Sequence, residues 1–218
     1  MRKIIVNEFI TLDGVIQAPG GPEEDTSGGF KSGGWITSYW DEMLGKILDD
    51  FMAKPFDLLL GRKTYEIFAA YWPYVENDIA DKFNAANKYV VSKTINKLNW
   101  KNSFLIKGNI IDEIRKLKEQ DGPELHIYGS SNLVKTLINS NLIDQLNVWT
   151  FPVAVGKGKQ LFGEGTYAVS LKLVDVKSSL KGVIIAAYEP SGELKTGSVS
   201  SENVSEEERE RRRKFALE

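Results

Sequence analysis

The sequence predicts an α/β fold with a mixed, mostly parallel sheet that is flanked by helices and ends in antiparallel strands. Two observations carry this prediction. Up to about residue 141, short apolar runs alternate with segments of helical periodicity, which is typical of parallel strands joined by crossover helices. From residue 142 to residue 188, apolar runs follow one another without helices between them, which is typical of antiparallel strands.

The composition indicates one domain with a real core and excludes several kinds of site. The 218-residue chain has no cysteine, which excludes disulfides and thiol catalysis, and its one histidine, His126, excludes a multi-histidine metal site. A formal net charge of −2 gives no reason to expect nucleic-acid binding. No apolar run is long enough to span a membrane and the N-terminus does not resemble a signal peptide, so we expect a cytoplasmic protein without metal or membrane partner.

The first half of the chain begins with a β-branched strand at residues 3–10. Residues 17–34 follow as a long loop of Gly, Pro, Ser and acidic residues, which is either a mobile lid beside a ligand or a plain insertion. A helix capped by Thr37 or Ser38 comes next. Further strands are expected at 57–60, 88–91 and 104–106, and further helices at 63–70, 78–86 and 110–119.

The second half contains one more strand–helix pair and then strands alone. A strand at 125–128 precedes a helix that begins near residue 132, and strands are expected at 142–155, 170–176 and 183–188. We therefore predict one domain over residues 1–190. Residues 191–218 are rich in Gly and Ser and then almost wholly charged, which predicts a flexible tail or a solvent-exposed helix.

Three of the predicted strands end in residues that suit an anion. These residues are Gly61, Arg62, Lys63 and Thr64 after the second strand, Ser92 and Lys93 after the third, and Gly129, Ser130 and Ser131 after the strand at 125–128. Ligands sit at the carboxyl ends of parallel strands, and free N–H groups at a helix start favour negative charge. Taken singly, each junction also fits an ordinary strand-to-helix turn with solvent-exposed cations.

Four motifs resemble, in order, the dihydrofolate reductase superfamily, and together they cover residues 3–189. The segments at 11–14 (Thr-Leu-Asp-Gly) and 35–37 (Trp-Ile-Thr) resemble the reductase domain of the bifunctional riboflavin-biosynthesis deaminase-reductase. The segment at 61–65 (Gly-Arg-Lys-Thr-Tyr) is similar to Gly-Arg-Lys-Thr-Trp of dihydrofolate reductases, and 91–94 (Val-Ser-Lys-Thr) to their next hydroxyl-rich segment. The turn at 129–131 falls where the superfamily has Gly-Gly before a helix.

This resemblance implies a dihydrofolate reductase-like three-layer fold, NADPH as cofactor and often a homodimer. Arg62, Lys63 and Thr64 would then hold the cofactor phosphates, Ser92 and Lys93 would lie near the adenosine 2′-phosphate, and the turn at 129–131 would meet the pyrophosphate. The preference for NADPH over NADH rests on Arg62 and Lys93. Ser130 stands where the family has its second glycine, and a serine tolerates fewer backbone conformations.

A catalytic carboxylate is expected from Asp41 or from Asp13. Asp41 precedes Leu44 by three residues, close to the inward face of its predicted helix, although an acidic residue there also complements the helix dipole. Asp13 belongs to the Leu-Asp-Gly match, and its other role is to hydrogen-bond the turn. His126 lies inside a strand and is expected to be structural.

The function that the resemblance implies is an NADPH-dependent reductase. It would transfer hydride to a small-molecule heterocyclic substrate of pterin-like or pyrimidine-like chemistry. Two alternatives remain open at this stage, because a fold does not fix a function. One is a reductase of an unrelated small molecule, and the other is a non-catalytic nucleotide-binding module on the same fold.

Overall fold

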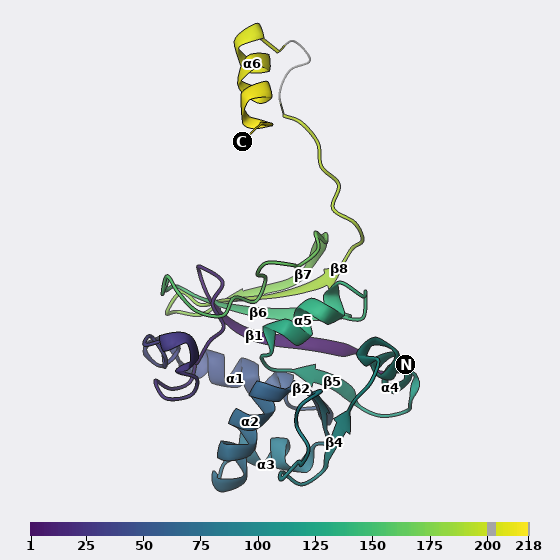
Figure 1. The fold of residues 1–218 in the computed structure, drawn as a ribbon. Coiled ribbons are helices and arrows are strands. Elements are labelled where there is room, and N and C mark those ends of the chain that lie inside the picture. Colours follow the sequence, from purple (N-terminus) through teal and green to yellow (C-terminus); the bar gives the residue numbers. More distant parts are fainter. Residues whose placement is uncertain (200–203, 218) are drawn as a thin grey trace.

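The computed structural model describes residues 1–199 and 204–217, and its centre is one eight-stranded sheet between two layers of helices (Figure 1). In sheet order the strands are β4 (Ser103–Ile106), β3 (Lys88–Val91), β2 (Phe56–Gly61), β5 (Glu124–Ile127), β1 (Ile4–Thr11), β6 (Gln145–Phe151), β8 (Ile184–Pro190) and β7 (Leu171–Ser178). Strands β1 to β6 pair in parallel, and β6 pairs with β8 and β8 with β7 in antiparallel fashion. The predicted fold class is confirmed.

The helices cover both faces of the sheet, since the central strands are apolar on both sides. Leu58, Leu59 and Leu60 of β2 are all fully buried, as expected for a strand that is covered twice. Apolar residues of α4 and α5 pack with Leu59 on one face, and those of α1, α2 and α3 pack on the other. These helices are α1 (Glu42–Phe51), α2 (Arg62–Tyr71), α3 (Asp78–Ala85), α4 (Ile110–Glu119) and α5 (Ser131–Ile138).

The first helix begins later than the sequence predicts. Residues 37–39 form a separate 3₁₀ turn, and Trp40 is extended (φ −67°, ψ 134°), so neither Thr37 nor Ser38 caps α1. Trp40 packs against Phe9 and Trp149, with ring centroids 5.9 and 6.3 Å apart. This aromatic contact holds the chain in an extended conformation, and the helix starts only after it.

Strand β6 is shorter at both ends than the predicted strand at 142–155. At its start, Asp144 Oδ2 accepts a hydrogen bond from Ile4 N at 2.7 Å and pairs with Lys118, so this residue links the start of β1 to α4. Past its end, Pro152 has no N–H to donate to a neighbouring strand. Leu142 and Ile143 before the strand are buried in the core, whereas Val153 and Val155 after it are only partly buried.

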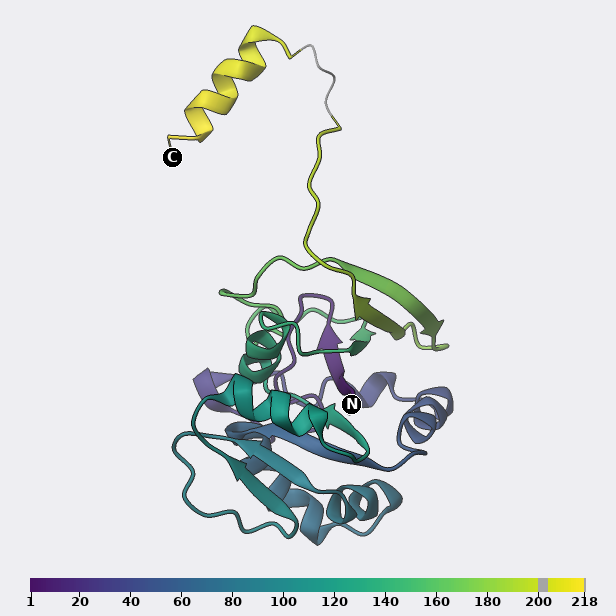
Figure 2. The same cartoon turned by 90° about the vertical axis from the view of Figure 1, so that its right-hand side faces the viewer.

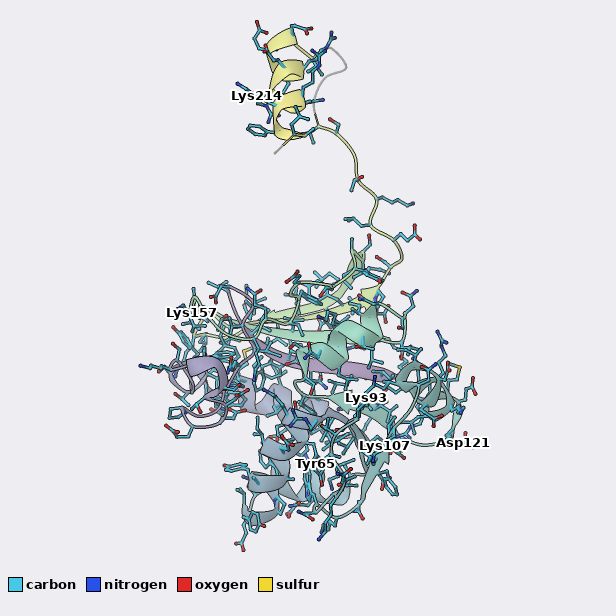
Figure 3. All side chains as sticks on the ribbon, in the orientation of Figure 1. Tyr65, Lys93, Lys107, Asp121, Lys157 and Lys214 are labelled. Carbon is cyan, nitrogen blue, oxygen red and sulfur yellow. The ribbon has the colours of Figure 1, made fainter. Side chains whose placement is uncertain are left out.

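The chain leaves the sheet after β8 and ends in α6 (Glu206–Phe215), which has no buried residue. Figures 1 and 2 show α6 standing apart from the sheet at the end of an extended segment, and Lys214 in Figure 3 lies far from the side chains of the sheet layers. Residues 200–203 and 218, which the predicted tail includes, lie outside the described residues. None of the described helices has the length and apolarity to cross a membrane.

Candidate functional site

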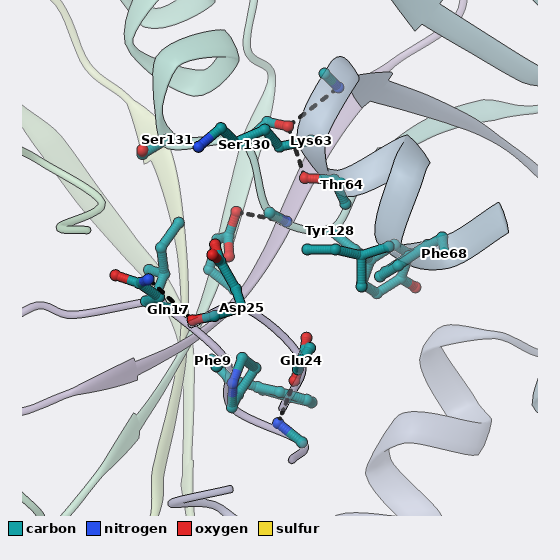
Figure 4. Close-up of a pocket in the computed structure, with 18 of the residues that line it drawn as sticks. Phe9, Gln17, Glu24, Asp25, Lys63, Thr64, Phe68, Tyr128, Ser130 and Ser131 are labelled. Carbon is teal, nitrogen blue, oxygen red and sulfur yellow. Dashed lines mark hydrogen bonds between the residues drawn. The ribbon is translucent and has the colours of Figure 1, made fainter. Parts of the chain in front are cut away.

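A cavity of about 1450 Å³ lies at the carboxyl ends of the parallel strands. The lining includes the end of β1, Ile16, residues 17–25 of the long loop and the first turns of α2 and α5. The aromatic residues Phe9, Phe68 and Tyr128 lie on its walls, with Thr64 and Ser130 at one side and Gln17 and Asp25 opposite (Figure 4). The cavity therefore combines apolar walls with a small number of hydrogen-bonding groups, as ligand sites do.

The hydroxyls of Thr64 and Ser130 join the starts of α2 and α5. Their oxygens are 2.7 Å apart, and Ser130 Oγ also accepts a hydrogen bond from Gly61 N at 3.1 Å (Figure 4). Gly129 and Ser130 both have left-handed backbones, with φ of 81° and 75°. A Cβ on Gly129 would lie 3.2 Å from Thr64 Oγ1, so a glycine lets this turn approach α2 closely.

The predicted residues at two of the three strand ends line this cavity, and those at the third do not. Gly61 to Thr64 and Gly129 to Ser131 all line it. Ser92 and Lys93 lie outside its lining, although Val91 before them contributes to it. The Ser92 hydroxyl is buried and accepts hydrogen bonds from the backbone of residues 94 and 95, so it closes a local turn. Lys93 is exposed.

Of the two cations at the start of α2, Arg62 has a partner on its own helix. Arg62 Nη1 lies 3.0 Å from both carboxylate oxygens of Glu66, one turn further on, and the Arg62 side chain is 41% exposed. An exposed pair of this kind contributes little to stability. Breaking the pair with Glu66 to bind an anion in the cavity would therefore cost Arg62 little free energy.

The structure corrects the placement of Asp41, which lies outside the lining of the cavity. Because α1 begins at Glu42, Asp41 is its N-cap, and its Oδ1 accepts a hydrogen bond from Leu44 N at 2.9 Å. The sequence places Asp41 inside the first turn near the inward face. The later helix start turns it into a capping residue instead.

Asp13 also lies outside the lining of the cavity. It accepts hydrogen bonds from Thr11 Oγ1 and from the N–H groups of Val155 and Gly156, the last at 2.7 Å. The Thr11 hydroxyl and these two amides outweigh partial burial and hold the pKa of Asp13 below its ordinary value. This carboxylate ties the turn after β1 to the loop after β6, which is the alternative role expected from the sequence.

A carboxyl that does line the cavity, and that was not predicted from the sequence, is Glu8 in β1. Glu8 is only 4% exposed, and its Oε1 accepts a hydrogen bond from Gly129 N at 2.8 Å. Burial raises its pKa to about 8, against the smaller opposite effect of that hydrogen bond. The signal in the sequence is the polar pair Asn7-Glu8 inside an otherwise apolar strand.

The long loop is held beside the cavity by a second missed residue, Gln17. Its buried side chain donates to the carbonyls of Asp25 (3.0 Å) and Ser27 (2.9 Å) and accepts from Lys159 N (3.1 Å). Lys159 also forms an ion pair with Asp25. Burial of Asp25 would raise the pKa of its carboxyl, but hydrogen bonds from Lys159 and Ser27 outweigh it and lower the pKa. The predicted mobility of this loop stays a prediction.

His126 lies outside the cavity lining, in β5. Its ring stacks on Phe56 with centroids 4.7 Å apart, and burial lowers its pKa despite the nearby Glu124. A neutral, stacked imidazole fits the structural role expected of it. Among residues 1–199 and 204–217, no group of three or more His, Asp or Glu side chains could hold a metal ion.

Fold and cavity together define an α/β protein with a cavity at the carboxyl edge of its parallel strands. Comparison of sequences identifies the family: residues 2–185 match the RibD C-terminal domain, and the chain belongs to that family. A relative in Bacillus subtilis (strain 168), the uncharacterized protein YyaP, is 30% identical over 196 residues, which are 88% of this chain and 96% of that protein.

Solved structures show the same fold at low sequence identity. The Thermotoga maritima diaminohydroxyphosphoribosylaminopyrimidine deaminase/5-amino-6-(5-phosphoribosylamino)uracil reductase is 16% identical with a TM-score of 0.58, over 87% of this chain and 57% of that one. Dihydrofolate reductase from Enterococcus faecalis, solved in complex with NADP(H), is 15% identical with a TM-score of 0.55, over 86% of this chain and 96% of that one. These likenesses confirm the expected dihydrofolate reductase-like fold.

Proposed function

We propose that this protein is an NADPH-dependent reductase that acts on a pterin-like or pyrimidine-like heterocycle. The observation that carries the proposal is the convergence of two strand ends on one cavity, where Thr64, Ser130 and the turn at Gly129 face apolar walls. The solved structures named above add support. One protein with this fold was solved with NADP(H), and the name of another includes a uracil reductase.

The residues around the cavity suit a dinucleotide. The starts of α2 and α5 offer backbone N–H groups to phosphates, Arg62 and Lys63 add positive charge, and Gly129 leaves room for close approach. Phe9, Phe68 and Tyr128 provide flat apolar surface for rings. NADPH, when bound, supplies the hydride. The chain's own task is to align cofactor and heterocycle and to exclude water from between them.

The test compares NADPH with NADH, using the wild type, Arg62→Ala and Arg115→Ala. We expect the wild type to prefer NADPH, and Arg62→Ala to lose about 1.5–3 kcal/mol of NADPH binding, the value of a hydrogen bond to a charged group. Arg115 is the matched control, because it forms a similar exposed pair on α4 but lies outside the cavity lining. Equal affinity of the wild type for both cofactors would contradict the assignment of a 2′-phosphate site to Arg62 and to Lys93.

Oxidation of NADPH over a panel of pterins and aminopyrimidines separates the remaining possibilities. Turnover of a panel member supports the proposed substrate class, turnover of none but another small molecule supports a different reductase, and binding without any turnover supports a nucleotide-binding module. In the same series, Asp41→Asn and Asp13→Asn test the catalytic roles that the resemblance implies for these carboxyls. We also propose a homodimer, which sedimentation of the purified protein would test.

A further inference from the structure

Glu8 is a buried carboxyl to which the proposed function has assigned no task. Strands β1 and β5 are parallel neighbours with Val6 opposite Ile127, so two residues further on Glu8 stands beside Gly129. Its Oε1 takes the hydrogen bond of Gly129 N. Among the residues that the structure describes, Oε2 has no hydrogen-bond partner, and the side chain lines the cavity.

Within the described parts of the chain, no cation pairs with Glu8. The charged or titratable groups that line the cavity from the loop are Glu23, Glu24 and Asp25, and Asp25 is engaged by Lys159. From α2 come Arg62, which is paired with Glu66, and Lys63, while β5 leads into Tyr128, whose pKa is raised by burial. A buried carboxylate without a cation is costly, and such a group takes up a proton instead.

We propose that Glu8 takes part in dinucleotide binding as a neutral acid, donating a hydrogen bond from Oε2 to a phosphate oxygen at the turn of Gly129 and Ser130; this inference rests on the proposed cofactor. In the neutral form, the acid adds a donor where the turn already offers N–H groups and the start of α5 favours negative charge. In the charged form, Glu8 repels the phosphate and holds the Gly129 N–H more strongly. Binding therefore requires the protonated state.

The consequence is a pH dependence of NADPH affinity with a defined sign. With a pKa of about 8, Glu8 is mostly protonated at pH 7 and mostly charged at pH 9. The dissociation constant of NADPH should therefore rise about tenfold between pH 7 and pH 9, since each binding event above the pKa must take up one proton. The second pKa of a phosphate monoester is about 6, so the ligand's own charge changes little between pH 7 and pH 9.

Calorimetric titration with NADPH at pH 7 and pH 9 tests the proposal, using the wild type, Glu8→Gln and Glu124→Gln. Glutamine keeps a donor and an acceptor but cannot titrate, so Glu8→Gln should bind with the same affinity at both pH values. Glu124→Gln, at the far end of β5, is the matched control and should retain the tenfold change. A ¹³C NMR titration of the Glu8 carboxyl in the wild type gives its protonation without relying on a variant.

Three results would overturn the role of Glu8: wild-type affinity that does not change with pH, affinity that improves at pH 9, or a tenfold change that survives in Glu8→Gln. Tighter binding at pH 9 would mean that a carboxylate accepts a hydrogen bond from the ligand. If NADPH does not bind at pH 7, the proposed cofactor fails, and inorganic pyrophosphate becomes the probe. A tenfold weakening of pyrophosphate binding from pH 7 to pH 9 in the wild type relative to Glu8→Gln would keep Glu8 as a phosphate-binding acid, because the comparison cancels the titration of pyrophosphate itself. No pyrophosphate binding would overturn it.

Discussion

Ser130 holds a backbone conformation that a glycine adopts without strain. Its φ of 75° and ψ of 67° lie in the left-handed region, where a side chain costs about 1–2 kcal/mol. The Ser130 hydroxyl offsets this cost, because it accepts from Gly61 N and shares a hydrogen bond with Thr64. Ser130 therefore keeps a left-handed turn and adds a link to α2.

We expect Ser130→Ala to lower the free energy of unfolding by about 1–3 kcal/mol, because it keeps the strain and leaves the partly buried Gly61 N–H without its partner. Ser130→Gly loses the same hydroxyl but relieves the strain, so it should be the more stable of the two variants. Urea unfolding of both variants and the wild type measures this order. Equal stability of the two variants would show that the backbone at residue 130 carries no strain.

Asp13 should make stability depend on pH in the acid range. Its folded pKa lies below the ordinary value of 3.8, so its contribution is fully present above pH 3.8 and is lost as the pH falls through the lower folded value. Asp13→Asn should therefore lose less stability than the wild type between about pH 4 and pH 2. Thermal unfolding across this range measures the difference. Asp121→Asn, at an exposed turn position, is the control and should follow the wild type.

At the scale of single residues, the sequence located the groups whose position follows from a local motif. Gly61 to Thr64 and Gly129 to Ser131 line the cavity as predicted, because parallel strands bring their carboxyl ends to one edge of the sheet. Glu8 could not be predicted, because its burial depends on β5 as a neighbour that is more than a hundred residues away in the sequence. Asp41 was misplaced because the start of α1 is set by the packing of Trp40 against Phe9.

At the scale of elements, the existence and order of strands and helices could be predicted, and their ends less well. Strand β3 and helix α4 have the predicted bounds, since each has a clear pattern and clear flanking breaks. Strand β6 is shorter than predicted at both ends. Before it, the Asp144 side chain accepts a hydrogen bond from Ile4 N, and after it, Pro152 has no N–H to donate to a neighbouring strand. A pattern of apolar residues reflects burial, not strand pairing. In β6, burial extends beyond the paired residues, to Leu142 and Ile143.

Backbone hydrogen exchange in the long loop can be predicted at this scale. We expect Gln17→Ala to speed backbone hydrogen exchange in residues 18–30, because three hydrogen bonds of the Gln17 side chain hold this segment beside the cavity. Saturating NADPH should slow exchange in residues 17–34 of the wild type if the loop closes on a ligand. Gln120→Ala, at the exposed end of α4, is the control. Unchanged exchange in Gln17→Ala would show that the ion pair of Lys159 and Asp25 is enough to hold the loop.

At the scale of the whole molecule, the sheet and its covering helices form the folded unit. Helix α6 is stabilised by contacts within the helix itself. The Ser205 hydroxyl caps α6 by accepting from Glu208 N, and Glu208 pairs with Arg211 and Arg212 on the next turn. These pairs are exposed and contribute little. The segment directly after β8 is different: Ser170 N donates to Gly192 O, Ser191 N to Ser170 O, and Ser170 Oγ to Glu193 O.

The position of a C-terminal truncation should therefore decide its effect on stability. Removal of the chain after Leu194 leaves the three hydrogen bonds of Ser170 in place and should change the free energy of unfolding by less than about 0.5 kcal/mol, as for surface changes in general. Removal after Pro190 deletes those bonds, each worth about 0.5–1.5 kcal/mol, and should lower the melting temperature measurably. Both truncated proteins should bind NADPH like the full chain, because residues 191–218 contribute nothing to the described lining of the cavity. A sharp fall in melting temperature for the truncation after Leu194 would mean that α6 packs on the domain or on a second subunit in solution, and sedimentation of the full chain and the truncated one would distinguish these two cases.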